Sequence, residues 1–339
     1  PKILASVLKR RSPLVMSEIT GIESPTGARA HGFFVAVPFL SWQFLELEED
    51  YVIEKISKAC KLAKKIGAKI VGLGAFTAIP GGGGRMLANL VDIPITTGNT
   101  YTTALAIEGS KQAAQFMDIK LENAKVAVVG ATGSIGRACA QILAPEVGNL
   151  VLVGRDQLRL EQVQEKIKKA SSVTTDVSCN IRESLRESDL VITVTGSTDS
   201  IIYPDDLKPG SIVCDVARPR DVSKLVTEAR NDVLVIDGAI VNTPGDVNFN
   251  LDYGPPPTMA EGCVAETIIL TLERRYENYT IGKNITVEMV KEMGELGKKH
   301  GFSIAGLRRH EKLLSEQQIQ KVKRNAAKVL KLGYKSSVG

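Results

Sequence analysis

One stretch constrains the fold of this chain more than any other: residues 124–155, AKVAVVGATGSIGRACAQILAPEVGNLVLVGR. It reads as an apolar strand, a glycine-rich turn, an amphipathic helix and a second apolar strand. Apolar residues recur in the helix at positions i, i+3, i+4, i+7 and i+8, which predicts one packed face made of Ile135, Ala138, Cys139, Ile142 and Leu143. Two strands joined through a helix form a βαβ unit, whose strands are parallel. We therefore predict a parallel sheet with helices packed against it.

The turn GATGSIG places three glycines three residues apart, a variant of the GxGxxG spacing. Glycine at such positions permits a tight turn, close approach of a pyrophosphate and tight packing of the helix on the strand. The first turn of the following helix offers amide donors to phosphate oxygens. The sequence therefore predicts a dinucleotide site made of Gly130, Ala131, Thr132, Gly133, Ser134, Ile135 and Gly136, with Gly196 at the end of the predicted strand 189–196.

The residues after the second strand indicate which dinucleotide binds. An Asp or Glu there would hold the 2′-hydroxyl of the NAD ribose, whereas this chain has Arg155, with Arg159 one turn further on. A guanidinium suits the 2′-phosphate of NADPH. Asp156 follows Arg155 and can instead cap the helix that begins at residue 157. NADPH is therefore the cofactor that we expect.

Strand and helix patterns alternate through most of the chain, which predicts an α/β protein. Before residue 124 we expect a strand pair within 14–40, a helix at 51–67, a buried strand at 68–74 and a helix at 100–117. Near-continuous apolar runs predict further strands of the parallel sheet at 171–177, 189–196, 211–217 and 233–241. We expect three consecutive parts: an N-terminal α/β substrate domain (1–120), a Rossmann domain (121–250) and a helical region with a basic tail (251–339).

The five cysteines are widely spaced, and no CxxC pair occurs. Only three histidines could join them as metal ligands, so neither a zinc site nor a disulfide framework is expected. The longest apolar runs have the length of strands rather than of membrane helices, and the first residues lack a secretory signal. These features predict a cytoplasmic protein in which any cysteine chemistry would be that of a single thiol.

Cys263 lies in the segment PPPTMAEGCVAETIILTLERR, where three prolines precede an apolar run of helical length. Thr258 and Glu261 form the pattern of a capping box, which predicts a helix that begins at Met259 and has Cys263 in its second turn. The helix dipole favours a thiolate there, while the charges of Glu261 and Glu266 disfavour it. On these residues alone Cys263 is either a buried structural cysteine or a nucleophile. The other four cysteines are expected to be structural.

Five motifs occur in an order that is known from one enzyme family: LGAFTAI (73–79), TTGNTYTTA (96–104), VAVVGATGSIG (126–136), the Cys263 helix, and ITVEMVKEMGELGKKHGF (285–302). Over residues 15–302 the chain thereby resembles the long-chain acyl-[acyl-carrier-protein] reductase family. The resemblance implies that Cys263 takes an acyl group from acyl carrier protein or coenzyme A as a thioester, and that NADPH reduces it to a fatty aldehyde. A cysteine suits this chemistry because an acyl-enzyme splits one hard step into two.

The resemblance also implies that TTGNTY contributes to the nicotinamide and acyl site, with Asn99 and Tyr101 as catalytic candidates beside Thr97 and Thr100. The same residues read equally well as a turn and a helix N-cap. The family has His at the position of Tyr101, and a phenol titrates far higher than an imidazole, so a different pH profile is expected. The glycine-rich loop 74–84 is a candidate lining of the acyl entrance.

Two other functions stay open. An alcohol dehydrogenase of the shikimate/quinate type also joins an α/β domain to a Rossmann domain, but it relies on a Lys–Asp pair that we cannot place in this first domain. The other alternative is a protein that binds NADPH without turnover.

The C-terminal segment 307–335 is basic, with nine Lys or Arg residues against Glu311 and Glu316. It is either a solvated helical tail or a docking site for an acidic partner. An acidic carrier protein and the surface of a membrane are the partners that we expect for such a site, rather than nucleic acid.

Overall fold

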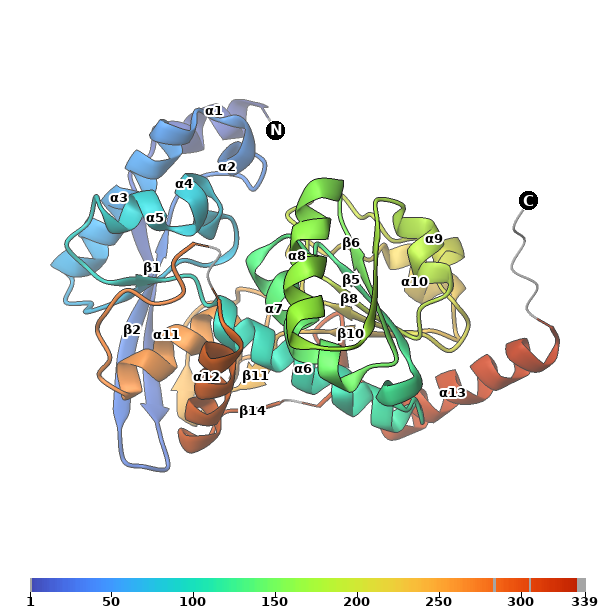
Figure 1. Cartoon of the computed structure of the whole chain (residues 1–339). Coiled ribbons are helices and arrows are strands. Elements are labelled where there is room, and N and C mark those ends of the chain that lie inside the picture. The colour runs from blue at the N-terminus through green and yellow to red at the C-terminus, as the bar shows by residue number, and fades with distance from the viewer. Residues whose placement is uncertain (1, 283–284, 305, 334–339) are drawn as a thin grey trace. The chain divides into compact units, whose positions relative to one another are not determined.

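The computed structural model describes residues 2–282, 285–304 and 306–333 (Figure 1). The chain divides into two compact units, each built from two separate segments of the sequence. Unit 1 comprises Pro1–Thr102 and Ile240–Ser303, and unit 2 comprises Thr103–Ala239 and Ile304–Gly339. This division differs from the three consecutive parts expected from the sequence, because the chain returns to unit 1 after the Rossmann segment.

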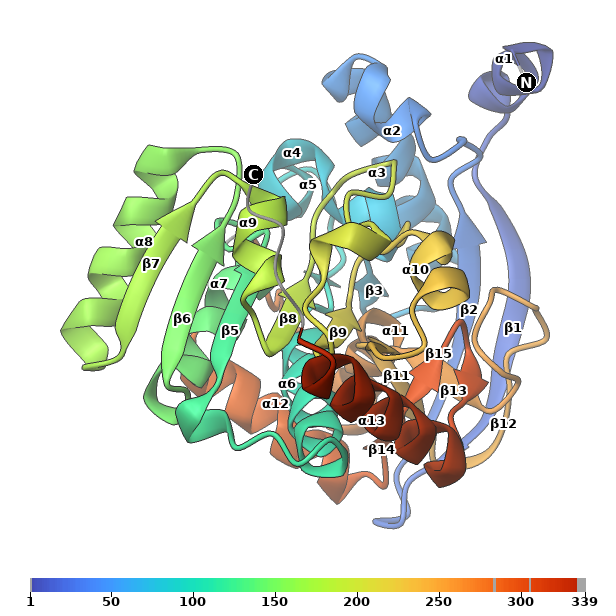
Figure 2. The same ribbon diagram turned by 90° about the vertical axis from the view of Figure 1, so that its right-hand side faces the viewer.

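Unit 2 contains a six-stranded sheet with the strand order β10-β9-β8-β5-β6-β7 (Figure 2). Its strands are β5 (Lys125–Val129), β6 (Asn149–Val153), β7 (Thr174–Ser178), β8 (Leu190–Thr193), β9 (Ile212–Asp215) and β10 (Leu234–Asp237). Every neighbouring pair is parallel. This is the Rossmann order, with the first strand at the centre and later strands added on either side. The predicted α/β class and parallel sheet are confirmed.

Helices cover both faces of this sheet. One face packs against α6 (Asn99–Phe116), α7 (Ser134–Leu143), α8 (Gln157–Ala170) and α13 (Glu316–Lys331). The other face packs against α9 (Ile181–Arg186) and α10 (Lys224–Ala229). Because the central strands are buried on both faces, they are apolar at nearly every position, which is why the sequence pattern located them. A short hairpin, β15 (Arg308–Arg309) and β16 (Lys312–Leu313), precedes α13.

Unit 1 is built around the hairpin of β1 (Leu14–Glu23) and β2 (Arg29–Ala36), to which β12 (Gly245–Asn248) adds antiparallel to β1. Because β12 comes from the second segment of the unit, this pairing joins the two segments. The first segment also holds α1 (Lys2–Arg10), α2 (Gln43–Glu46), α3 (Glu49–Lys65), β3 (Val71–Gly72), α4 (Pro80–Gly83), α5 (Arg85–Ala88) and β4 (Ile95–Thr96). The second holds β11 (Ile240–Asn242), β13 (Met259–Glu261), α11 (Gly262–Leu272) and α12 (Val287–Lys299), and ends at the first residue of β14 (Ser303–Ile304).

Two expectations for the C-terminal part were wrong. The predicted capping box of Thr258 and Glu261 does not start a helix at Met259, because Met259–Glu261 pairs with β11 as strand β13. The helix α11 begins at Gly262, with Glu261 as its N-cap residue and no side-chain capping bond among the described residues. The region 251–339 is also not helical throughout, since β13, β14, β15 and β16 interrupt the helices.

Candidate active site

The glycine turn of unit 2 has the geometry that a bound pyrophosphate requires. Gly130 follows β5 with a φ of +83°, a conformation that glycine adopts readily and other residues rarely do. A Cβ atom at Gly136 would lie 2.4 Å from the Gly130 carbonyl oxygen, so glycine is needed for α7 to begin this close to the turn. Among the described residues no side chain caps α7. Since a helix leaves its first N–H groups without intrahelical partners, the first turn of α7 suits phosphate oxygens.

The other predicted residues of the turn lie around this helix start. Ala131 is buried and donates its N–H to Val153 O at 3.2 Å. Gly133 is the N-cap residue of α7 and donates its N–H to Gly130 O at 2.9 Å. Thr132, Ser134 and Ile135 are half-buried.

A buried carboxylate fixes the loop that carries Gly196. Asp221, fully buried, accepts hydrogen bonds from the Thr193 hydroxyl at 2.6 Å, the Thr195 N–H at 3.0 Å and the Thr195 hydroxyl at 2.5 Å. Burial raises the pKa of Asp221, and these hydrogen bonds act in the opposite direction. The loop lies against the dinucleotide turn, because a Cβ at Gly130 would be 2.2 Å from the carbonyl oxygen of Val194. Sequence reasoning missed Asp221, since a single Asp in a loop carries no local signal.

Arg155 is exposed just after β6, and Arg159 is exposed in the first turn of α8. Asp156 caps α8 through a hydrogen bond from Arg159 N at 3.1 Å, which confirms its capping role. The same carboxylate forms an ion pair with Arg159 Nε at 3.1 Å. Within the described residues Arg155 has no ion-pair partner, so its guanidinium is the better placed of the two to bind a 2′-phosphate.

In unit 1, Cys263 is the second residue of α11 and is half-buried. Desolvation raises the pKa of its thiol to about 12, and the negative charge of Glu261 acts in the same direction. Hydrogen bonds from the backbone N–H groups of Val264 and Ala75 lower the pKa without cancelling that effect. The resting side chain is therefore a neutral thiol, rather than the thiolate that a position near the helix N-terminus alone would favour. One oxygen of the Glu261 carboxylate lies 4.0 Å from the sulfur.

The LGAFTAI motif lies against this cysteine. Ala75 has a φ of +48°, which is uncommon for a residue other than glycine. It opens a short 3₁₀ helix (Ala75–Ala78) directly after Gly74, and a Cβ atom at Gly74 would be 4.0 Å from the Cys263 sulfur. Strained backbone of this kind clusters at functional sites, where the surroundings hold it in place. At Ala75 the strained backbone accompanies an N–H group that points at the Cys263 thiol.

The TTGNT turn touches the backbone of the cysteine. A Cβ atom at Gly98 would lie 2.1 Å from the Cα and 2.4 Å from the Cβ of Cys263, and Gly98 has a φ of +75°. A Cβ at Gly262 would lie 2.7 Å from the hydroxyl oxygen of Thr102. Two glycines therefore bring the start of α6 against the start of α11, which the sequence did not reveal. The half-buried Asn99 follows Gly98 directly.

Glu266 lies one turn after Cys263 on α11, and its carboxylate links α11 to the TTGNT turn and to Thr280. Its carboxylate is fully buried and accepts hydrogen bonds from the Thr96 hydroxyl at 2.5 Å, the Tyr101 N–H at 2.9 Å and the Thr280 hydroxyl at 2.8 Å. The hydroxyl of Thr100 also donates to it. A buried carboxylate is tolerated when such donors satisfy its oxygens. Thr97 belongs to the same cluster through a 2.7 Å hydrogen bond from its hydroxyl to Thr280 O.

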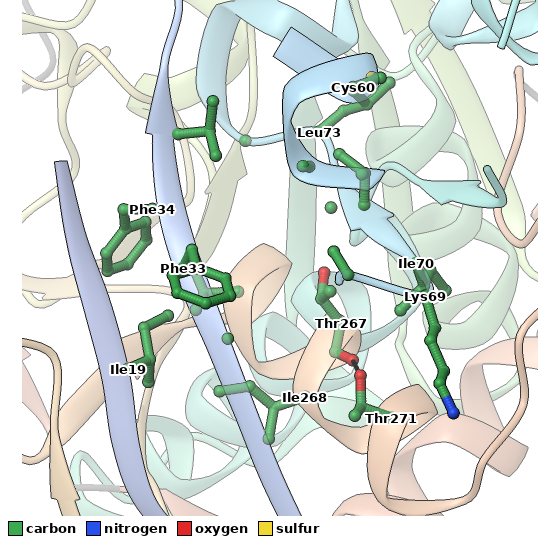
Figure 3. A pocket seen from close by; sticks show the side chains of 18 of the residues that line it. Ile19, Phe33, Phe34, Cys60, Lys69, Ile70, Leu73, Thr267, Ile268 and Thr271 are labelled. Atoms are coloured by element: carbon green, nitrogen blue, oxygen red, sulfur yellow. Dashed lines mark hydrogen bonds between the residues drawn. The ribbon is translucent and has the colours of Figure 1, made fainter. Parts of the chain in front are cut away.

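An apolar cavity of about 540 Å³ within unit 1 has Cys263 in its wall. Side chains from β1, β2, α3, the β3 region and α11 surround it (Figure 3), among them Ile19, Phe33, Phe34, Cys60, Leu73 and Ile268. The hydroxyls of Thr267 and Thr271 also line it, but they donate to carbonyl oxygens of their own helix, at 3.1 and 2.8 Å. The volume is typical of small-molecule sites, which span roughly 300–1,000 Å³. The wall therefore suits an aliphatic chain.

Two tyrosines occupy different places in unit 1. Tyr101 is only 3% exposed and packs against α12, where a Cβ at Gly297 would be 2.6 Å from its hydroxyl oxygen. Its role as a proton donor stays a prediction. Sequence reasoning missed Tyr253, whose hydroxyl donates to Met259 O at 3.1 Å and whose ring lies 4.7 Å from that of Phe34 in the cavity wall. Burial raises the pKa of Tyr253, and the charges of Glu261 and of an ionised Cys263 act in the same direction.

Within the described part of the chain, no three His, Cys, Asp or Glu side chains are grouped so that they could bind a metal ion. No helix among the described residues is long and apolar enough to cross a membrane.

The family model for shikimate/quinate 5-dehydrogenase matches residues 111–238, a range that lies inside unit 2. Together with the strand order and the glycine turn, this match settles the class of unit 2. Unit 2 is an NAD(P)-binding Rossmann domain.

Two curated relatives match most of the chain. A protein named aminotransferase PigE, from Serratia sp. (strain ATCC 39006), is 32% identical over 329 residues, which cover 94% of this chain. This chain spans 37% of the length of that relative. A long-chain acyl-[acyl-carrier-protein] reductase from Synechococcus elongatus is 29% identical over 306 residues, which cover 86% of this chain and 87% of that protein.

The solved structures that match are more distant. Glutamyl-tRNA reductase from Methanopyrus kandleri is 17% identical, with a TM-score of 0.33 over 84% of this chain and 57% of its own. Quinate dehydrogenase from Corynebacterium glutamicum is 16% identical, with a TM-score of 0.32 over 57% of this chain and 61% of its own.

Proposed function

We propose that this protein is an NADPH-dependent reductase that converts long-chain acyl thioesters to fatty aldehydes through an acyl group carried on Cys263. The observation that carries the proposal is the position of the Cys263 thiol in the wall of the apolar cavity. A long-chain acyl substrate needs both a nucleophile and an apolar site of this size. The similarity to a long-chain acyl-[acyl-carrier-protein] reductase over 86% of this chain supports the same activity.

Acyl transfer requires that the neutral thiol lose its proton. In our mechanism the proton passes from Cys263 to the Glu261 carboxylate, whose oxygen lies 4.0 Å from the sulfur. The N–H groups of Ala75 and Val264 stabilise the thiolate as it forms. The sulfur then bonds to the carbonyl carbon of the substrate, and the bond from that carbon to the sulfur of the carrier or coenzyme breaks. The departing thiolate takes the proton back from Glu261, so that a free thiol leaves.

NADPH, when bound, supplies the hydride that reduces the thioester carbon. Arg155 would hold its 2′-phosphate, and the glycine turn with the first turn of α7 would hold its pyrophosphate. On the side of the acyl group, Asn99 is our first candidate to hydrogen-bond the reacting oxygen, because it follows Gly98, which touches Cys263. Tyr101 is retained as a predicted proton donor, with Tyr253 as a second phenol near the thiol. The bond between the former thioester carbon and the Cys263 sulfur then breaks as the aldehyde is released, and the Cys263 thiolate takes up one proton to return to its thiol form.

The test is aldehyde formation from palmitoyl-coenzyme A and NADPH by the wild-type protein and by Cys263→Ala. Cys60→Ala is the matched control, because Cys60 is also a thiol in the wall of the cavity and is 1% exposed. We expect Cys263→Ala to form no aldehyde and Cys60→Ala to keep its activity. Full activity in Cys263→Ala would contradict the proposed mechanism.

The family match of unit 2 favours one rival, an NADP-dependent alcohol dehydrogenase of the shikimate/quinate type. That rival needs a polar site for a polyol, whereas the wall of the cavity in unit 1 is mainly aliphatic and aromatic. Reduction of NADP in the presence of quinate or shikimate, undiminished in Cys263→Ala, would favour the rival. Binding of NADPH without aldehyde from any acyl donor would instead favour a protein without this catalysis.

A further inference from the structure

A row of four cations follows the outer face of α13 in unit 2. Lys321, Arg324, Lys328 and Lys331 recur at i, i+3, i+7 and i+10, so they form one stripe along the helix, about 15 Å long at 1.5 Å per residue. All four are exposed. The buried face of α13 is formed by Ile319, Val322 and Ala326, which lies opposite this stripe on a helix of 3.6 residues per turn.

The stripe differs from an ordinary solvated helix face in its lack of carboxylates. The outer faces of α8 and α12 carry Glu and Lys side by side, whereas α13 has no acidic residue after Glu316. Lys323, which lies off the stripe, forms an ion pair with Asp118. None of the four stripe residues has an ion-pair partner among the residues that the structure describes. Uncompensated charges of one sign create a field that attracts an oppositely charged partner.

A crevice beside the stripe adds a second feature. It has a volume of about 190 Å³, lies between α10 and α13, and is lined by Arg309 and Lys321 together with the apolar Leu314 and Ile319. Lys321 thus belongs to the stripe and to the crevice. Leu313 is 58% exposed just before α13, and Leu330 is 50% exposed near its end. A partner with carboxylates would therefore find complementary charges along residues 321–331, and an apolar side chain of that partner would find the crevice beside Lys321.

From these observations we propose that the α13 stripe is the docking surface for an acidic acyl carrier protein that delivers the acyl thioester. The inference rests on the proposed function, under which the acyl donor is either a small coenzyme or a carrier protein. A coenzyme needs no surface outside its own binding site. A row of four unpaired cations is the complement of a protein surface that carries a row of carboxylates, and such pairs set association rate and partner choice.

The test compares two triple variants with equal charge change. Lys321→Glu/Arg324→Glu/Lys328→Glu reverses the stripe, and Lys166→Glu/Lys168→Glu/Lys169→Glu reverses three exposed lysines at the end of α8. Binding of palmitoyl-acyl carrier protein is measured by fluorescence anisotropy, and turnover is measured with palmitoyl-acyl carrier protein and with palmitoyl-coenzyme A. Binding is also measured to vesicles of phosphatidylglycerol and phosphatidylcholine in equal parts.

We expect the stripe variant to bind the carrier about tenfold or more weakly at low salt. The difference should shrink as salt is added, because salt screens exposed charges. The α8 variant should bind the carrier like the wild type, and all three proteins should turn over palmitoyl-coenzyme A equally. Turnover of palmitoyl-coenzyme A tests the proposed function without the carrier protein. If the reductase proposal is wrong, no aldehyde forms from palmitoyl-coenzyme A, and this result is separate from any result on carrier binding.

Three results would overturn the docking proposal. The first is unchanged carrier binding in the stripe variant, and the second is an equal loss in both variants, which would reflect net charge alone. The third is binding of the wild-type stripe to the anionic vesicles with no binding to the carrier, which would make α13 a membrane-contacting helix instead.

Discussion

Replacing Gly98 by Ala tests the contact between the TTGNT turn and the candidate nucleophile. Gly98 has a φ of +75°, and a Cβ there would lie 2.1 Å from the Cα of Cys263. Ordinary van der Waals contact begins at 3.4 Å, so the two segments must separate by 3.4 − 2.1 = 1.3 Å. A misplacement of about 1 Å at a reacting group lowers a rate by about 10²-fold. We therefore expect acyl transfer to Cys263 to slow by about 10²-fold or more.

Gly27→Ala is the matched control for backbone strain. Gly27 has a φ of +82° in the turn between β1 and β2, and nothing lies within 4 Å of the Cβ that Ala would add. Both variants place Ala in the left-handed region, which costs roughly 1–2 kcal/mol of folding free energy. Only Gly98→Ala also displaces Cys263. The difference between the variants therefore isolates the displacement.

The assay measures the rate at which coenzyme A is released from palmitoyl-coenzyme A in a single turnover without nucleotide. The released coenzyme A is quantified by chromatography. Thermal unfolding is recorded for both variants, so that a loss of fold is distinguished from a loss of acyl transfer. Gly27→Ala should release coenzyme A at the wild-type rate. A folded Gly98→Ala protein with an unchanged rate would refute the reasoning, because Cys263 would then react without the geometry described for it.

Four further predictions follow from the same residues. Glu266→Gln replaces one of the two carboxylate oxygens, which together accept four donated hydrogen bonds, by an NH2 group that cannot accept them. It should lower the melting temperature and slow acyl transfer, and a change in neither would contradict the positioning role. Glu261→Gln removes a charge that raises the pKa of Cys263. The rate of alkylation by iodoacetamide, which in the wild type should rise about tenfold per pH unit up to the thiol pKa of about 12, should become faster at pH 8 in this variant, while acyl transfer becomes slower. Acyl transfer that is unchanged or faster would argue against Glu261 as the base. Ala63 lines the cavity, so the larger side chain of Ala63→Phe fills part of it. The kcat/KM for palmitoyl-coenzyme A should then fall about tenfold relative to that for octanoyl-coenzyme A. Equal losses for both substrates would count against the cavity as the acyl site. Arg155→Ala should raise the KM for NADPH at least tenfold and leave the KM for NADH unchanged, since only NADPH has a 2′-phosphate. A retained preference for NADPH would show that Arg155 does not bind this phosphate.

The Rossmann unit could be predicted in detail because its signals are local. Each central strand is buried on both faces, so its apolar run in the sequence coincides with the strand, as for β5, β6 and β9. The glycine turn must follow β5 directly, and Asp156 caps the helix that follows it in sequence. All these relations connect residues within one turn or one βαβ unit.

The site in unit 1 was harder to predict because its contacts join distant parts of the chain. Gly98 and Cys263 touch across 165 residues of sequence, and Glu266 binds Thr96 and Thr100 across 170 and 166 residues. The expected capping box failed for a related reason: β11 supplies the pairing that makes Met259–Glu261 a strand. Tyr253 and Asp221 could not be found, since neither belongs to a motif and only the fold gives each its neighbours.

The most direct test of the central claim is the intact mass of the protein after mixing with palmitoyl-coenzyme A in the absence of nucleotide, with peptide mapping of any adduct. We predict one palmitoyl group on Cys263, absent in Cys263→Ala, retained in Cys60→Ala, and lost on addition of NADPH with an equal amount of palmitaldehyde. Aldehyde formation with no adduct on Cys263, or an adduct that persists after NADPH is added, would contradict an acyl-enzyme on this cysteine.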